Sequence, residues 1–65
     1  MKRRAFEKHL REHGCELDRH GANHDVWVNA RTGLDSTLPR HREVKQPIVR
    51  AVCRQLGVPV PGKAS

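Results

Sequence analysis

Two amphipathic segments enclose a middle stretch of alternating residues, and this order constrains the fold more than any other feature of the 65-residue chain. In residues 2–13, Phe6 and Leu10 stand four positions apart, which places both on one side of a helix. In residues 46–56 a wider apolar stripe recurs at helical spacing: Ile48, Val49, Val52, Cys53 and Leu56. The sequence therefore predicts one helix near each end of the domain, and the two apolar stripes are expected to share one core.

The sequence contains clear signals for three of the four helix ends, but not for the start of the first helix. Gly14 and Gly57 follow them and suit the left-handed conformation that ends a helix, and Pro47 suits the first turn of the second helix. The first helix instead begins on three cations, residues 2–4, where the helix dipole favours acidic side chains. This end of the helix therefore either frays or its basic cluster has another use.

Three short segments between the helices have the composition and alternation of strands: residues 15–19, 24–29 and 34–38. Pro39 is expected to end the third strand, because it has no N–H to offer a neighbour. Three antiparallel strands with both helices on one face satisfy this order best, so we expect an α+β domain of αβββα type. Double-stranded-RNA-binding domains share this architecture.

The alternation leaves one question about the sheet open. The second strand places His24, Val26 and Val28 on one face and Trp27 on the other, and the period alone does not show which face the helices cover. A strand tryptophan in a chain with one Phe and no Tyr is more often a core residue than a base-stacking one. The tryptophan therefore favours burial of its own face, while the period leaves open which face that is.

The chain is strongly basic. Thirteen Lys and Arg against seven Asp and Glu give a formal net charge of +6 and a pI of about 10.4. Residues 1–35 carry a net charge of only +1, and residues 36–65 carry +5. Such a surplus favours a polyanionic partner, of which nucleic acid is the commonest, over a solvated basic surface or an acidic protein partner.

Composition excludes several other classes of protein. Cys15 and Cys53 do not make a disulfide framework, and the longest run of apolar side chains, residues 26–28, is far too short to span a membrane. No apolar stretch follows the basic N-terminus, as it would in a secretory signal. We therefore expect a reduced, cytoplasmic protein with no membrane partner.

His24 is the residue best suited to chemistry. It opens the second strand directly after Gly21, Ala22 and Asn23, so its side chain stands at the edge of the sheet, where a ligand can approach. Imidazole titrates near neutral pH, so it can take a proton from an RNA 2′-hydroxyl or give one to the leaving 5′-oxygen without a metal ion. The competing interpretation is an ordinary surface histidine at the end of a strand.

A basic loop, residues 40–46, is the second candidate site. Arg40, His41 and Arg42 can hold a phosphodiester, with the guanidinium groups supplying forked donors, and Lys45 is a weaker candidate. The alternative is a solvated basic loop with no ligand.

A metal site is the less favoured use of the same residue types. Possible zinc ligands are present, but without any of the usual paired spacings: Cys15, His20, His24, His41 and Cys53. His9 and His13, four apart on the first helix, could also hold a metal, but their position indicates that they flank the core. We therefore expect neither a metal ion nor a small-molecule cofactor.

Three short motifs follow one another in a specific order. Gly21-Ala22-Asn23-His24 precedes an apolar strand, Leu38-Pro39-Arg40-His41 follows a hairpin, and the last helix ends Arg54-Gln55-Leu56-Gly57. In this order and in so short a chain, the motifs resemble the HicA family of small bacterial toxins. The resemblance covers residues 1–58, which we take as one domain. Residues 59–65 are rich in Pro and Gly and are expected to form a flexible tail.

This resemblance implies a fold like that of double-stranded-RNA-binding domains. It also implies a ribosome-independent endoribonuclease that cleaves messenger RNA without a metal and is neutralised by a HicB antitoxin. His24 matches the family's catalytic histidine. RNA or phosphate contacts are expected from Gly21, Ala22, Asn23, Arg40, His41, Arg42 and Lys45. The chain departs from the family at Ala22, where Ser or Gly is usual, so a phosphate contact through a hydroxyl would be lost while one through the backbone N–H would survive.

Two functions other than a nuclease are compatible with the same sequence. One is a non-catalytic nucleic-acid-binding module that uses the basic loop, and the other is a basic interaction protein that docks an acidic partner. If removal of His24 abolishes cleavage while binding survives, the protein is a nuclease and not only a binding module. Weak RNA affinity at physiological salt would instead indicate the interaction protein.

Overall fold

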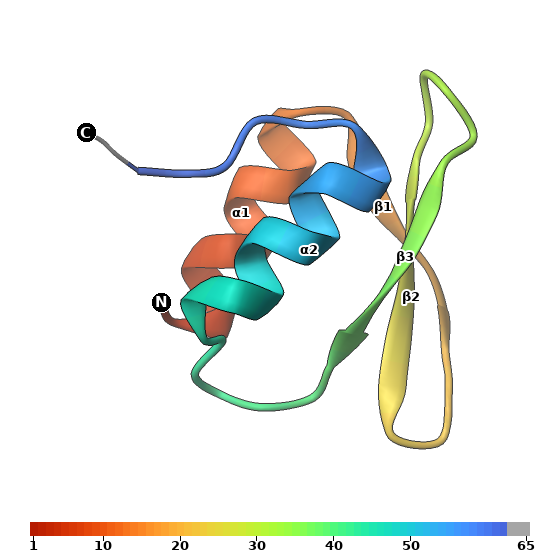
Figure 1. The fold of residues 1–65 in the computed structure, drawn as a ribbon. Coiled ribbons are helices and arrows are strands. Elements are labelled where there is room, and N and C mark those ends of the chain that lie inside the picture. The colour runs from red at the N-terminus through yellow and green to blue at the C-terminus, as the bar shows by residue number, and fades with distance from the viewer. Residues whose placement is uncertain (63–65) are drawn as a thin grey trace.

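The structure is a computed structural model that describes residues 1–62 of the chain. Its elements follow one another as α1 (Arg3–Glu12), β1 (Cys15–His20), β2 (His24–Asn29), β3 (Asp35–Pro39) and α2 (Gln46–Leu56). The strands form one antiparallel sheet in the order β1-β2-β3, and both helices lie on the same side of it (Figure 1). The predicted αβββα fold is therefore confirmed, and each element ends within one residue of its expected position.

The core lies between the two helices and the sheet. Its fully buried members come from α1, β2, β3 and α2, and they include Phe6, Leu10, Trp27, Leu38 and Leu56. The apolar side chains of both helices meet there, so both helices pack on the same face of the small sheet.

β2 shows which face of the sheet the helices cover. Asp25, Trp27 and Asn29 are buried, whereas the residues between them are only partly buried. Trp27 is therefore a core residue, as the sequence indicates, with 1% of its surface exposed. The opposite face, on which His24, Val26 and Val28 lie, is covered by neither helix (Figure 1).

The prediction that Ile48 belongs to the core is wrong. Its side chain is 38% exposed, whereas Val49, Val52 and Leu56 on the same helix are at 3% or less. At 3.6 residues per turn, Ile48 lies about 70° from the centre of the stripe that these three residues form. It therefore faces the edge of the domain, beside the loop that precedes α2.

β3 is displaced by one residue from its expected position. Leu34, expected to open the strand on the same face as Leu38, precedes it and is 47% exposed. Pro39, expected to follow the strand, is its last residue and pairs with His24. The end of an edge strand tolerates proline, because no further neighbour needs its missing N–H.

The basic start of α1 is held by contacts with the loop after β3. The backbone N–H of Arg3 donates to the carbonyl of Arg42 at 2.7 Å, and Lys2 forms an isolated antiparallel bridge with Glu43. The side chain of Arg3 reaches the sheet, where it pairs with Asp25. Of the two alternatives for the basic cluster, the structure therefore supports another use over fraying.

The segment after α2 returns to α1. Gly57 ends α2 in the left-handed conformation with φ of 73°, as predicted, and Val58 packs against the core. The Nε2 atom of His9 donates to the carbonyl of Pro59 at 2.7 Å. Residues 63–65 of the expected tail lie outside the described residues. Within residues 1–62 neither helix is long and apolar enough to cross a membrane.

Candidate functional site

His24 combines a fixed backbone with a free side chain. It is the first residue of β2, its backbone pairs with Pro39 of β3, and its carbonyl accepts a hydrogen bond from the N–H of Gly21 at 2.7 Å. Its side chain is exposed on the face that the helices leave open, and its ring has no hydrogen bond within residues 1–62. Such a ring is positioned by the sheet and accessible to a ligand.

The turn before His24 requires glycine at its first position. A Cβ atom added to Gly21 would lie 2.6 Å from the carbonyl oxygen of His24, closer than real Cβ contacts allow. The N–H of Gly21 is used inside the turn, and its carbonyl accepts a hydrogen bond from Arg40 at 2.5 Å. Of the three turn residues expected to bind phosphate, Ala22 and Asn23 are exposed, and in the described part of the chain their N–H groups have no partner.

We expect Gly21→Ala to distort this turn and to move His24. The added carbon must displace backbone atoms, which destabilises the fold by about 1–3 kcal/mol. Thermal unfolding measures the loss of stability, and the NMR signals of the His24 ring report its displacement. Ala22→Ser in the same turn serves as the control. A Gly21→Ala protein with unchanged melting temperature and unchanged His24 signals would show that the turn tolerates a side chain.

Asp25 is the centre of a polar cluster next to His24. Its Oδ2 accepts a hydrogen bond from Nη2 of Arg3 at 2.8 Å, and its Oδ1 accepts one from Nε of Arg40 at 2.9 Å. The same Oδ1 lies 2.8 Å from Nδ1 of His20. The carboxylate is buried, so three partners from α1, β1 and the loop after β3 compensate its charge.

The sequence interpretation did not identify Asp25 as part of the site. A signal was present, since strand alternation places Asp25 on the same face as Trp27. An acidic side chain on a buried face needs a cationic partner, and the chain has a surplus of arginine. Which arginines pair with it could not be read from their positions, which are 22 and 15 residues away.

The hydrogen bond from His20 is the main cause of a lowered pKa at Asp25; Arg40 lowers it further, and burial opposes both. Because this pKa is lower in the folded than in the unfolded chain, Asp25 stabilises the fold at neutral pH. That contribution is lost as the pH falls from about 4, the unfolded value, through the folded value.

We expect Asp25→Asn to be less stable than the wild type by about 2 kcal/mol at pH 7. The variant should also lose less stability on acidification, because the titrating carboxylate is gone. Urea unfolding at pH 7 and at successively lower pH values measures both effects. Asp18→Asn is the matched control, since the partner of Asp18 among the described residues is the exposed Arg19. Equal pH dependence in Asp25→Asn and the wild type would contradict the role of Asp25.

The structure separates the three loop residues expected to bind phosphate together. Arg40 lies next to the turn of His24, bonded to Asp25 and to the Gly21 carbonyl. Arg42 lies by the start of α1, in a shallow hollow that it shares with Lys2, Arg3, Arg4, Glu7 and Glu43. His41 lies in a third place, next to Pro39 at the end of β3. The loop therefore presents its cations in different directions.

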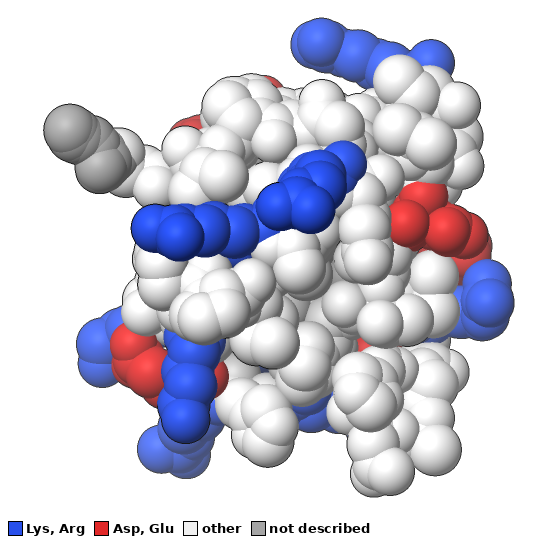
Figure 2. All heavy atoms as spheres, viewed as in Figure 1, with Lys and Arg blue, Asp and Glu red and all other residues white. Residues whose placement is uncertain are grey.

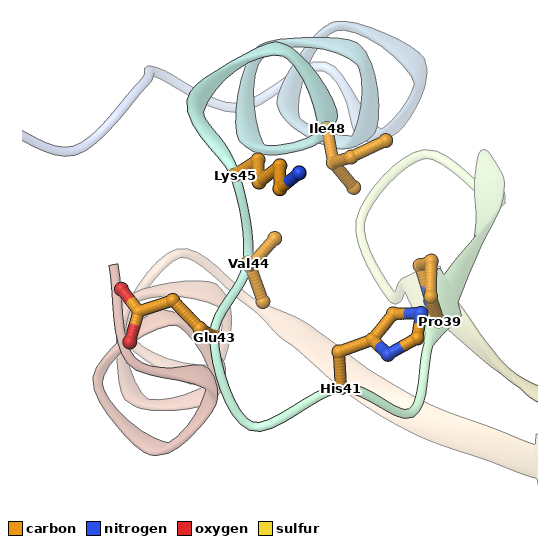
Figure 3. A pocket seen from close by; sticks show the side chains of 6 residues that line it. All are labelled: Pro39, His41, Glu43, Val44, Lys45 and Ile48. Atoms are coloured by element: carbon orange, nitrogen blue, oxygen red, sulfur yellow. The ribbon is translucent and has the colours of Figure 1, made fainter.

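His41 and Lys45 line a hollow of about 560 Å³ between the end of β3 and the start of α2 (Figure 3). In Figure 3 the ring of His41 points toward Pro39, and the side chain of Lys45 extends toward Ile48. Pro39, which lines this hollow, pairs with His24 on the neighbouring strand. The hollow and the candidate histidine are therefore separated by one strand-to-strand step. The structure thus brings His41 and Lys45 together, apart from Arg42.

Lys and Arg side chains are scattered over the helical side of the molecule and are not gathered in one patch there (Figure 2). Arg50 and Arg54 of α2 contribute to this surface and are exposed. On this side of the molecule the described cations are therefore spread apart, and within residues 1–62 only Arg40 among the predicted cations is bonded to the turn of His24.

The possible metal ligands are dispersed. In the described part of the chain, no group of three or more His, Cys, Asp or Glu side chains is placed to hold a metal ion. Both thiols are buried, and burial raises their pKa values, that of Cys53 to about 11. His9 and His13 lie at the edge of the core with ring centroids 4.3 Å apart.

A comparison of the sequence with models of protein families gives a match over most of the chain. The family model described as HicA toxin of bacterial toxin-antitoxin matches residues 3–58. The chain belongs to the HicA toxin family. The match begins with α1 and ends just after Gly57, so every element of this HicA toxin lies inside it. No curated protein and no solved structure gives a significant match. Membership of HicA implies a toxin that acts within a bacterial toxin–antitoxin pair, and hence an antitoxin partner.

Proposed function

We propose that this HicA toxin is an endoribonuclease that cleaves messenger RNA without a metal ion, with His24 as its catalytic histidine. The observation that carries the proposal is the placement of His24. Its backbone is held by the Gly21 turn and by β3, while its ring is exposed on the free face of the sheet. The cleavage of messenger RNA associated with HicA toxins supports the same reaction.

For this reaction the protein needs to supply mainly a group that transfers protons and positive charge around the phosphate. The 2′-hydroxyl of RNA attacks the neighbouring phosphorus, so nucleophile and electrophile are already joined in the substrate. His24 takes a proton from the 2′-oxygen or gives one to the 5′-oxygen. Cations around the phosphate stabilise the negative charge that grows on its oxygens.

Arg40 is the cation best placed for this purpose. Its guanidinium is tied to the turn of His24 through the Gly21 carbonyl, and it is held from the other side by Asp25. Among the described residues, its Nη1 hydrogens have no protein partner and can donate to a phosphate oxygen. His41, Lys45 and the N–H groups of Ala22 and Asn23 supply further contacts along the RNA, and Arg42 contributes at a greater distance.

We further propose that a HicB antitoxin neutralises the toxin in the cytoplasm. A partner with acidic side chains over His24 and Arg40 would compete with phosphate for the same donors and cover the exposed ring. Such a partner accounts for the basic surface and for the toxin–antitoxin family at once.

Incubation of the purified protein with a long RNA in EDTA tests the proposal directly. We expect fragments that end in a cyclic phosphate, and we expect EDTA not to reduce their yield. RNA that binds but stays intact would indicate a non-catalytic binding module, and RNA that does not bind at physiological salt would indicate a protein that docks only an acidic partner.

RNA affinity is expected to fall steeply with salt, because each phosphate contact releases counterions. Arg40→Ala and Arg42→Ala should each weaken binding and lower the slope of log affinity against log salt by about one unit or less. Titrations of a labelled RNA at several salt concentrations measure both quantities. Arg31→Ala, in the hairpin at the other end of β2, is the control. A slope that stays unchanged in Arg40→Ala would count against the loop as a phosphate site.

A further inference from the structure

RNA cleavage by a 2′-hydroxyl involves two proton transfers. One group removes the proton of the 2′-oxygen as it attacks, and another gives a proton to the 5′-oxygen as its bond to phosphorus breaks. His24 alone can carry out only one of these at a time. A second proton carrier beside it would complete the reaction, and this inference rests on the proposed function.

His20 has the geometry of such a carrier. Among the contacts of residues 1–62, which include all five histidines, His20 alone has a ring nitrogen bonded to a carboxylate: Nδ1 lies 2.8 Å from Oδ1 of Asp25. The His20 side chain is 67% exposed, whereas that of Asp25 is 10% exposed. The buried carboxylate accepts a hydrogen bond from the N–H of Nδ1. Nε2 is therefore the ring atom that can exchange a proton with a substrate.

The surroundings of His20 hold its ring and bring a cation next to it. Oδ1 of Asp25 also accepts the hydrogen bond from Nε of Arg40, at 2.9 Å, so the imidazole and the guanidinium share one oxygen atom. Oδ2 of Asp25 is bonded to Arg3 of α1. Glu7 in turn accepts a hydrogen bond from Nε of Arg3 at 2.7 Å, so the cluster contains two carboxylates and two guanidinium groups. A phosphate that contacts Arg40 would lie near the His20 ring.

His20 and His24 lie on either side of the same turn. His20 is the last residue of β1 and His24 is the first of β2, and Figure 1 shows this turn projecting beyond the end of β3. His20 pairs with Asp25, on the face that the helices cover, whereas His24 lies on the open face. The two rings therefore flank the end of the hairpin from opposite faces. In-line displacement places the attacking and leaving oxygens on opposite sides of phosphorus, which suits two carriers in this arrangement.

We propose that His20 is a second catalytic residue that donates the proton of Nε2 to the leaving 5′-oxygen, while His24 accepts the proton of the 2′-hydroxyl. The O2′–P bond forms and the P–O5′ bond breaks, which leaves a 2′,3′-cyclic phosphate and a 5′-hydroxyl. His24 ends protonated and His20 neutral, and exchange with water restores both. We assign the donor role to His20 because its Nδ1 is bonded to Asp25, whereas no carboxylate within residues 1–62 is bonded to the ring of His24.

Two short RNAs that differ in one atom test this assignment. One has an ordinary cleavable linkage, and the other has sulfur in place of the bridging 5′-oxygen, which leaves as a thiolate and needs no proton. His20→Ala should cleave the ordinary RNA about 100-fold more slowly than the wild type, but the sulfur RNA at nearly the wild-type rate. His24→Ala should be slow on both. His13→Ala is the matched control and should behave as the wild type, because His13 lies just after α1, where its Nδ1 bonds to the carbonyl of His9 and its ring packs on that of His9.

Each other outcome decides against the assignment. If His20→Ala cleaves the ordinary RNA at the wild-type rate, or is equally slow on both RNAs, His20 is not the proton donor, although the nuclease itself stands. If the wild type cleaves neither RNA, the proposed function fails as well. His20→Gln is measured alongside, with its melting temperature, because its amide can still donate to Asp25. Restored cleavage of the ordinary RNA in this variant would show that the ring only positions Asp25 and would overturn the proposal.

Discussion

His24→Ala is expected to cleave RNA at least about 100-fold more slowly than the wild type, which is the usual contribution of one general acid or base. The fold should be unaffected, because the ring is exposed, and the free energy of unfolding should change by about 0.5 kcal/mol or less. RNA affinity should persist, since Arg40 and the other cations are retained in the variant. Single-turnover cleavage, RNA titration and thermal unfolding measure the three quantities, and growth arrest on expression should disappear with cleavage.

The control for this experiment is again His13→Ala, which changes a histidine just after α1 and outside the site. Cleavage by His24→Ala at nearly the wild-type rate would make the assignment wrong and leave His41 or His20 as the principal catalytic candidate. Cleavage that stops in EDTA would contradict the metal-free mechanism and direct attention to the Cys and His residues as ligands.

Leu56→Ala is expected to destabilise the fold by about 2–5 kcal/mol, because it removes a fully buried side chain from the core. A domain of this size has a total stability of only about 5–15 kcal/mol at best, so the substitution should unfold a large fraction of the molecules at 37 °C. Urea unfolding followed by circular dichroism measures the difference.

Ile48→Ala on the same helix is the matched control. Ile48 is 38% exposed and lies off the buried stripe, so its truncation should change the stability by about 0.5 kcal/mol or less. Equal losses in the two variants would show that α2 packs on a different face from the one described here.

The elements of the fold could be predicted because their signals are local. The spacing of Val49, Val52 and Leu56 indicates a helix, and Gly57 marks its end by a conformation that other residues rarely adopt. Alternation identifies the strands for the same reason, since it depends only on the residue two positions away. The exposure of Ile48 was not predictable in this way, because an apolar residue at the edge of a stripe looks the same in sequence whether or not another element covers it.

In the candidate site, too, the residues with local sequence signals could be predicted and those that depend on tertiary contacts could not. His24 could be located because the glycine turn before it and the strand after it are both local features. The cluster around Asp25 could not, because it joins residues from α1, β1, β2 and the loop after β3. For the same reason the loop cations were expected to act together, whereas Arg40, His41 and Arg42 have different neighbours.

The sequence by itself determined the order of the elements, their ends, the basic character of the protein and the position of His24 at a strand edge. Only the tertiary structure decided that the helices cover the face of Trp27 and leave that of His24 open. It also decided that Asp25 holds His20 and Arg40 beside the turn. The physical reason is that backbone conformation and periodicity depend on neighbours in the chain. The burial of a face and the pairing of a charge depend instead on residues that come together only when the sheet and helices pack.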